Sequence, residues 1–326
     1  MKILFFTSSG PDNLEDAYLH GLRSLYGADA VDYPKKEVMY KSFEGDPNSF
    51  YGRLFTIWRT LNDMEVDRTD LESKIKSGFF DFIIFGSAHR TLHFFEYFKN
   101  LLKPATTIFL DGEDTARVAR PTQKYLTFKR ELQPKVWYYK SFKIIPKPLY
   151  QQLPRPKNLL PISFAVPKEK ITFGISLAEK KSLLPGHIVD NEVREIFKKQ
   201  HSSSETYLFT KEEDYYRNLQ QSRFGITTKR GGWDCLRHYE IAANGAVMCF
   251  RDLHTKHEWC APHGLGKMNC VMYTCAEELF KRIEVMRDDE YNTLLKGSYD
   301  WISQQTTEVK ATDMLRRAHD FFKNTA

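Results

Sequence analysis

Residues Arg223–Leu253, RFGITTKRGGWDCLRHYEIAANGAVMCFRDL, decide the fold of this chain. They predict a strand over Arg223–Thr227, a basic glycine-containing loop, a helix, and a second strand over Ala246–Phe250 that is apolar enough to be buried in a parallel sheet. Asp234 is expected to cap the helix, because a carboxylate can accept hydrogen bonds from the free N–H groups of the first turn. Gly245, which follows an asparagine, can adopt the left-handed backbone conformation that ends a helix.

The loop between the first strand and the helix is suited to holding an anion. It consists of five residues, Thr228, Lys229, Arg230, Gly231 and Gly232. Backbone N–H groups of a glycine loop and of a helix N-terminus point toward a bound anion, typically a phosphate. The alternative is that the two cations are a solvated surface pair and the glycines form a simple turn.

Composition places the chain among globular proteins. Its 326 residues favour two domains, and 41% hydrophobic residues are enough for two cores. The balance of 48 basic and 42 acidic residues gives a net charge of +6, which suits anionic ligands but is too weak to indicate nucleic acid. Five cysteines, clustered late, indicate reduced thiols and a cytoplasmic setting. No window has the roughly 18 apolar residues of a membrane span.

The first half predicts a doubly wound domain. Lys2–Thr7 and Ala30–Tyr33 are expected strands on either side of a helix over Leu14–Tyr26. Further strands are expected over Phe80–Phe85 and Thr106–Leu110, with further helices over 71–77 and 92–102. The first loop lacks the three spaced glycines of a dinucleotide site, so an NAD fold is not supported.

Ionisable groups follow two of these strands. His89 follows one strand, and Asp111 and Asp114 follow the next. Because ligands bind at the carboxyl ends of strands in open α/β sheets, these three are the candidates for acid–base chemistry. Either aspartate could instead cap a helix near Thr115.

A proline-rich stretch separates the halves. Phe142–Pro167 contains six prolines and predicts an extended linker, with the domain boundary near Phe164. The domains are therefore expected at 1–163 and 164–326, with a cleft between them and a last helix over Ala311–Lys323 that closes back. The second half is expected to add strands over 171–175, 206–210 and 270–273, helices over 189–199, 212–221, 278–286 and 288–304, and a capping box at 274–277.

The run Tyr215–Leu253 resembles the donor-binding half of GT-B glycosyltransferases, and is similar in particular to the CgeB-like and group 1-like proteins. The positions that match their pattern are Tyr216, Ser222, Gly232, Asp234, Arg237, Glu240, Ala243 and Gly245. The resemblance continues into Asn269–Leu279. It is weaker in the first half, at Phe109–Asp114 and Phe128–Leu132.

The resemblance implies a glycosyltransferase with two Rossmann-like domains and a nucleotide-sugar donor. The donor diphosphate would lie on the loop 228–232 and the helix N-terminus, without a metal or cofactor. Glu240 would receive the ribose hydroxyls, and Asp234, Arg237 and His238 would lie beside the donor. Many retaining members carry a second glutamate where this chain has Gly232, so the stereochemical outcome stays open.

The first domain would then supply the acceptor side. A general base is expected from Asp111, Asp114 or His89. Lys129, Arg130 and Ser176 are candidate contacts to phosphate or acceptor, although a basic pair more often faces solvent. The aromatic residues of 40–58 and of 137–139 could stack on sugar rings or belong to the core.

A rival interpretation is a zinc site. Four residues of zinc-ligating type recur at every third position, His254, His257, Cys260 and His263. Two more cysteines lie downstream, but Cys270 falls in an expected strand and Cys275 at a helix start, a poor geometry for one closed site. The prediction is that no metal is bound.

The expected partners are a nucleotide-sugar donor and a glycan or lipid-linked acceptor, with no nucleic acid. By resemblance, the setting is polysaccharide biosynthesis in the cytoplasm, with peripheral contact to the inner membrane face. Two other functions use the same fold: a non-catalytic module that binds a nucleotide or phosphorylated glycan, and a nucleotide-sugar epimerase. Fold alone does not separate them.

Overall fold

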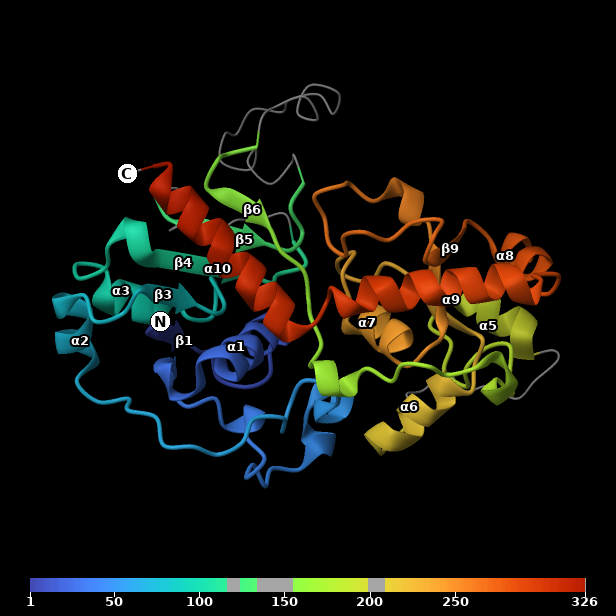
Figure 1. The fold of residues 1–326 in the computed structure, drawn as a ribbon, viewed down its shortest axis with the longest axis horizontal. Helices are drawn as coiled ribbons and strands as arrows, with labels where there is room; N and C mark the ends of the chain where they lie inside the picture. Colours follow the sequence, from blue (N-terminus) through green and yellow to red (C-terminus); the bar gives the residue numbers. More distant parts are fainter. Residues whose placement is uncertain (116–123, 134–154, 199–208, 326) are drawn as a thin grey trace. The chain divides into compact units, whose positions relative to one another are not determined.

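The chain forms two compact α/β units (Figure 1). The computed structural model describes residues 1–115, 124–133, 155–198 and 209–325. Unit 1 consists of Met1–Pro167, Trp259–Ala261 and Thr307–Ala326, and unit 2 consists of Lys168–Glu258 and Pro262–Thr306. Each unit is built on a parallel sheet, so the predicted α/β fold class is confirmed.

Unit 1 contains a six-stranded parallel sheet of order β2-β1-β3-β4-β5-β6. Its strands are β1 (Ile3–Phe6), β2 (Ala30–Tyr33), β3 (Phe82–Phe85), β4 (Thr107–Asp111), β5 (Leu126–Lys129) and β6 (Leu159–Pro161). Residues of the first five strands are almost all buried, as expected for a sheet covered on both faces. The chain runs from β1 outward to β2 and then returns to the other side of β1. The crevice between β1 and β3 is therefore the topological switch point, where ligands bind in such sheets.

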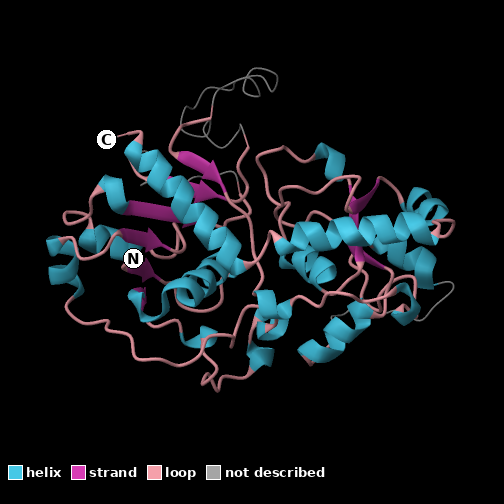
Figure 2. Cartoon of the chain, in the orientation of Figure 1, coloured by secondary structure: helices cyan, strands magenta, loops and turns pink. Residues whose placement is uncertain are grey.

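Helices cover both faces of this sheet (Figure 2). They are α1 (Asn13–Tyr26), α2 (Leu71–Ser77), α3 (Leu92–Phe98) and α10 (Thr307–Lys323). Helices α1 and α10 pack together, and a Cβ atom at Gly21 would lie 2.1 Å from the carbonyl oxygen of Thr307, so this close approach requires glycine. The opposite face packs Phe6 and Phe85 against α2 and α3. This is the layered arrangement that the alternating strands and helices predict.

Two expectations for unit 1 are corrected in detail. The described part of the predicted linker contains an edge strand, β6, which pairs with β5. Pro161 is tolerated there because an edge strand has one side without ladder hydrogen bonds. The last helix begins at Thr307, four residues before its predicted start at Ala311. The prediction followed the apolar stripe of the helix, and the residues of the first turn do not contribute to this stripe.

Unit 2 contains the three-stranded parallel sheet β7-β8-β9. Its strands are β7 (Phe224–Thr227), β8 (Val247–Arg251) and β9 (Cys270–Tyr273), and its helices are α5 (Asn191–Lys198), α6 (Glu212–Gln220), α7 (Leu236–Ala243), α8 (Ala276–Ile283) and α9 (Asp288–Ser303). One face of the sheet packs on α5, α8 and α9 in a continuous apolar core. Helix α7 contacts β7 closely, and a Cβ atom at Gly225 would lie 2.6 Å from the side chain of Ile241.

Three expectations for unit 2 are corrected or left outside the described residues. Residues 171–175 form no strand; this segment instead joins α7 and α9 through hydrogen bonds from Thr172 N to Ala243 O and from Ile175 N to Tyr299 Oη. The strand expected at 206–210 falls mostly outside the described residues. Before α8, Thr274 bonds to Glu278 rather than Glu277, since the N-cap is Cys275, one residue after the position that the predicted capping box gives it. The helix begins at Ala276, two residues earlier than predicted.

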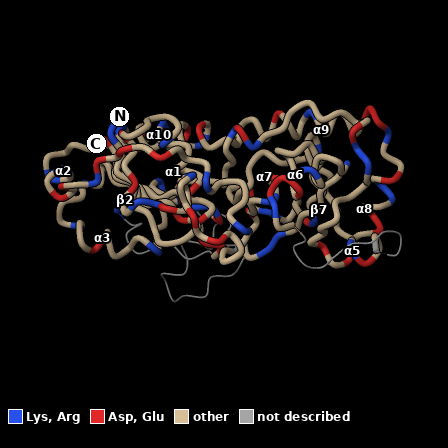
Figure 3. Tube along the Cα trace, turned by 90° about the horizontal axis from the view of Figure 1, so that it is seen from below, with Lys and Arg blue, Asp and Glu red and all other residues tan. Residues whose placement is uncertain are grey.

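Charged positions of both signs are interspersed along the trace (Figure 3). Among the described residues, no helix is long and apolar enough to cross a membrane.

Candidate functional site

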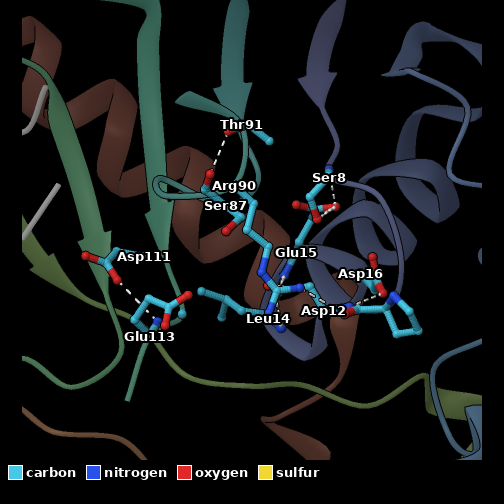
Figure 4. Close-up of polar contacts among 12 residues, drawn as sticks. Ser8, Asp12, Leu14, Glu15, Asp16, Ser87, Arg90, Thr91, Asp111 and Glu113 are labelled. Carbon is cyan, nitrogen blue, oxygen red and sulfur yellow. Dashed lines mark hydrogen bonds and ion pairs between the residues drawn. The ribbon is translucent and has the colours of Figure 1, made fainter. Parts of the chain in front are cut away.

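The carboxyl ends of β1, β3 and β4 bring the candidate residues of unit 1 to one edge of the sheet. The loop after β1 carries Ser8 and Asp12, and the loop after β3 carries His89 and Arg90. Arg90 reaches across the switch point toward Asp12 (Figure 4). Its NH1 donates to the carbonyl oxygen of Pro11 at 3.2 Å and lies 3.7 Å from the Asp12 carboxylate.

Asp111 ends β4 and lies at the centre of a buried ion pair. Its carboxylate is 3.0 Å from the ammonium of Lys129 and 3.6 Å from Nε2 of His89, and both Asp111 and Lys129 are fully buried. The register explains the first contact, because Asp111 and Lys129 are directly paired on β4 and β5. Burial alone would raise the pKa of Asp111, but the contact with His89 and the charge of Lys129 outweigh it and lower this pKa.

His89 is the accessible member of this group. Its side chain is 36% exposed. The contact with the Asp111 carboxylate raises the pKa of His89 above its ordinary value, against a smaller opposing effect of burial. A carboxylate behind an imidazole both orients the ring and favours its protonated form, so His89 can accept a proton from a ligand while Asp111 holds it in place.

Arg130 is buried at the end of β5. Its guanidinium donates twice to the carbonyl oxygen of Gly112, at 3.0 and 2.8 Å, and pairs with the exposed carboxylate of Asp114. The planar group also lies over the ring of Phe164 at 4.5 Å. Lys129 and Arg130 are therefore a buried pair, and the alternative that they face solvent is wrong.

A pocket of about 440 Å³ opens at this edge. Its polar lining includes Asp12, Arg90, Asp114 and Arg130, and its apolar lining includes Trp58 and Phe164. Apolar walls with a few convergent polar groups are typical of ligand sites.

A second buried charge cluster lies at the start of α1, and sequence reasoning missed it. The Lys36 ammonium pairs with Glu15 and lies 3.1 Å from Asp16, and Trp58 Nε1 donates to Asp16 at 2.6 Å. Burial raises the pKa of Glu15 to about 7, although Lys36 opposes the effect. Asp12 caps α1 by accepting from the N–H groups of Leu14 and Glu15. The sequence signal was available, since an Asp followed three residues later by Glu is a helix-start pattern.

In unit 2, the loop after β7 presents its cations to solvent. Lys229, Arg230 and Gly231 are exposed, whereas Gly232 and Trp233 are buried. The Lys229 ammonium lies 5.2 Å from the centre of the Trp233 ring, and Arg230 N donates to the carbonyl oxygen of Gly232. The tight turn thus holds two cations beside the start of α7.

The predicted N-cap role of Asp234 is wrong. Helix α7 begins at Leu236, its N-cap is Cys235, and the Cys235 side chain makes no capping hydrogen bond. Asp234, one residue before the N-cap, accepts a hydrogen bond from the Tyr239 hydroxyl at 2.9 Å.

The remaining candidates of α7 differ in accessibility. His238 is fully buried: its Nε2 donates to the carbonyl oxygen of Trp233, and its Nδ1 lies 2.9 Å from Oγ1 of Thr227. Arg237 is half-buried, with NH1 at 3.9 Å from the Cys235 sulfur.

Two further candidates have their own partners. Glu240 is 8% exposed and accepts from the Tyr215 hydroxyl at 2.9 Å, in a contact that ties α7 to α6. Ser176 is exposed, and its hydroxyl donates to Glu179 at 2.8 Å.

The zinc interpretation finds no site in the described residues. Nowhere in this part of the chain do three or more His, Cys, Asp or Glu side chains form a group placed to hold a metal ion. Of the four residues considered, Cys260 is buried and its thiol donates to the carbonyl oxygen of Leu132. The every-third-residue spacing was uninformative because the segment is a loop, in which sequence spacing does not set side-chain direction.

Solved structures share this fold over the whole chain. A crystal structure of Anabaena Alr3699/HepE in complex with UDP and glucose matches with a TM-score of 0.56 at 10% identity, covering 98% of this chain and 99% of that one. The same protein in complex with UDP-glucose matches with a TM-score of 0.53 at 10% identity, covering 97% of this chain and 99% of that one. A glycosyltransferase from Rickettsia africae ESF-5 gives 0.55 at 10% identity, with 99% of each chain covered. No family model and no curated protein matches the chain.

Proposed function

We propose that this protein is a glycosyltransferase that moves a sugar from a nucleotide-activated donor to a glycan or lipid-linked acceptor. The observation that carries the proposal is the exposed basic turn at Lys229 and Arg230 beside the start of α7, whose N-cap residue Cys235 makes no side-chain capping hydrogen bond. The likeness in fold to a Rickettsia glycosyltransferase and to a protein crystallised with UDP-glucose supports it. The resemblance to CgeB-like proteins stays a prediction.

In this proposal, unit 2 binds the donor. Lys229, Arg230 and the backbone N–H groups of the turn stabilise the diphosphate as negative charge develops on it, and no metal is needed. Glu240 accepts hydrogen bonds from the ribose, with Tyr215 holding the carboxylate in place. Buried His238 fixes the turn by joining β7 to the backbone of Trp233.

Unit 1 supplies the acceptor side. His89 removes the proton from the attacking hydroxyl, because it is the exposed member of the pair with Asp111. Asp111 acts through His89 as a positioning residue, and Lys129 keeps Asp111 ionised. Asp114 and Arg130 line the pocket in which the acceptor binds.

The test is a thermal-shift and hydrolysis screen with UDP, GDP, CDP, CMP and TDP sugars. A ligand at about 100 times its Kd stabilises the folded state by about 2.7 kcal/mol and raises Tm. The double variant Lys229→Ala, Arg230→Ala should lose about tenfold or more in affinity, because charge-assisted hydrogen bonds to the diphosphate disappear.

Lys281→Ala is the matched control, since Lys281 is an exposed cation on α8 of the same unit. It should bind the donor like the unaltered protein. The proposal fails if no sugar nucleotide raises Tm and none is hydrolysed. Binding without release of a nucleoside phosphate, in the presence or absence of acceptors, would favour a binding module.

A further inference from the structure

Three pockets of unit 1 follow one another along the carboxyl edge of its sheet. The pocket beside Asp114 shares Arg90 with a second pocket of about 370 Å³. This second pocket shares His93 and Phe94 with a third, of about 410 Å³, which residues of α3 line together with Tyr33 of β2 and Glu72 of α2. The shared residues place the three pockets next to one another in a row that begins at the candidate acceptor pocket, and we call this row the track.

Aromatic rings form the wall at the far end of the track. Phe94 packs on the core residue Phe6, with ring centres 5.2 Å apart, and meets the edge of Tyr33 at 5.8 Å. His93 lies 4.0 Å from Phe94, and Tyr97 follows one helical turn later with 72% of its surface exposed. The core contact with Phe6 holds Phe94 in place.

The rim of the track is polar, and its cations already have partners. Ser9, Lys35, Glu37 and Glu72 line it together with Arg90. The Lys35 ammonium pairs with Glu37 at 2.8 Å. Such a rim offers many hydrogen-bond donors and acceptors but little uncompensated positive charge.

We propose that this track binds a saccharide chain of several residues as the acceptor. Pyranose rings present apolar C–H faces, which pack on aromatic rings, and a rim of hydroxyls, which suits the polar lining. The paired cations argue against a phosphate-rich ligand, and the charged rim argues against an acyl chain.

The inference rests on the proposed function in naming the saccharide an acceptor. The end that receives the sugar lies in the pocket with Asp114 and Arg130, and the rest of the chain extends past Arg90 to Tyr97. A disaccharide would fill only the first pocket. Affinity should therefore rise with chain length until the track is filled.

The experiment measures binding of reducing-end-labelled neutral oligosaccharides, from disaccharides to octasaccharides, to the full-length protein without nucleotide sugar. An array of such saccharides first identifies which saccharide sequence binds. Titration calorimetry then compares the affinities of chains of different length. Tyr97→Ala should weaken the longest ligand by about three- to tenfold and leave disaccharide affinity unchanged, because only the long chain reaches this ring. Tyr97→Phe should restore the affinity.

Phe79→Ala is the control, because Phe79 is an exposed aromatic residue of the same unit outside the track. If no oligosaccharide binds, or if Tyr97→Ala and Phe79→Ala have the same effect, the inference is overturned. Length-dependent binding that Tyr97→Ala weakens supports the inference. If no nucleotide sugar is turned over in that case, the proposed function is contradicted but the saccharide site is not. Hydrolysis of a nucleotide sugar without any saccharide binding would remove the inference alone.

Discussion

The two candidate regions handle charge in opposite ways. At the carboxyl edge of unit 1, the central charged groups are buried and paired with one another, as in Asp111 with Lys129. In the turn after β7 of unit 2, Lys229 and Arg230 face solvent. A buried pair leaves no charge for a ligand but fixes the position of its neighbours. An exposed cation fixes little and can exchange water for a ligand anion.

This difference separates stability from binding. Removing one partner of a buried pair leaves an uncompensated charge in a low-dielectric interior, which is costly to the fold. Removing an exposed cation changes stability by roughly 0.5 kcal/mol or less. The comparison therefore predicts that substitutions in unit 1 act first on folding and that those in the unit 2 turn act first on the ligand.

The largest effect is expected from Asp111→Asn. The substitution keeps the shape and the hydrogen bond from the Glu113 N–H but leaves the ammonium of Lys129 buried without its counter-charge. We expect unit 1 to lose about 3–5 kcal/mol of stability. Urea unfolding monitored by hydrogen exchange of the β4 and β5 amides measures the loss of stability in this unit separately.

The double variant Asp111→Asn, Lys129→Met is the control. It removes both charges and should recover most of the loss, because a buried ion pair contributes little net stability compared with neutral groups of similar size. If Asp111→Asn alone has the same unfolding free energy as the unaltered protein, the pair is not desolvated. The contrast drawn between the two regions would then be wrong.

A smaller effect is expected from Tyr215→Phe in unit 2. The hydroxyl donates to the nearly buried carboxylate of Glu240 at 2.9 Å. Without it, the carboxylate loses a donor, and unit 2 should lose about 1–3 kcal/mol. Tyr97→Phe removes an exposed hydroxyl from unit 1 and serves as the matched control, with a change of roughly 0.5 kcal/mol or less. Equal losses in the two variants would show that α6 and α7 are not joined through this contact.

Much of the fold was predictable because each buried strand is a short apolar run. The strands at Ala30–Tyr33 and Cys270–Tyr273 have the predicted bounds. The run at 171–175 misled because apolar residues also line loops that pack on helices. Asp234 misled because a capping role depends on where the helix begins, and the hydroxyl of Tyr239, one turn later, takes its carboxylate.

The candidate site was less predictable, since it depends on pairing between distant segments. That Asp111 lies at the carboxyl edge follows from its place after an apolar run. That Lys129 is buried against it follows only from the β4–β5 register. Arg90 and Lys36 lie in loops, where single charged residues carry no periodic signal, so the contacts of Arg90 with Asp12 and of Lys36 with Glu15 were missed. The spacing of Asp12 and Glu15 indicates a helix start but not the pairing of Glu15 with Lys36.

The smallest effect concerns the pH dependence of His89, because this side chain is part-exposed and its charge is partly screened by solvent. Contact with Asp111 raises its pKa above the ordinary 6.5 in the folded state. The stabilisation from the protonated ring is therefore complete below about pH 6.5 and is lost as pH rises through the higher folded-state pKa. NMR titration of the ring protons measures this pKa directly, and Asp111→Asn should return it toward 6.5.

The imidazole can accept a proton only when neutral, so transfer activity should rise over the same pH window in which this stability declines. If the measured pKa lies at or below 6.5, Asp111 does not hold His89 as a charged partner, and the assignment of His89 as the base loses its physical support.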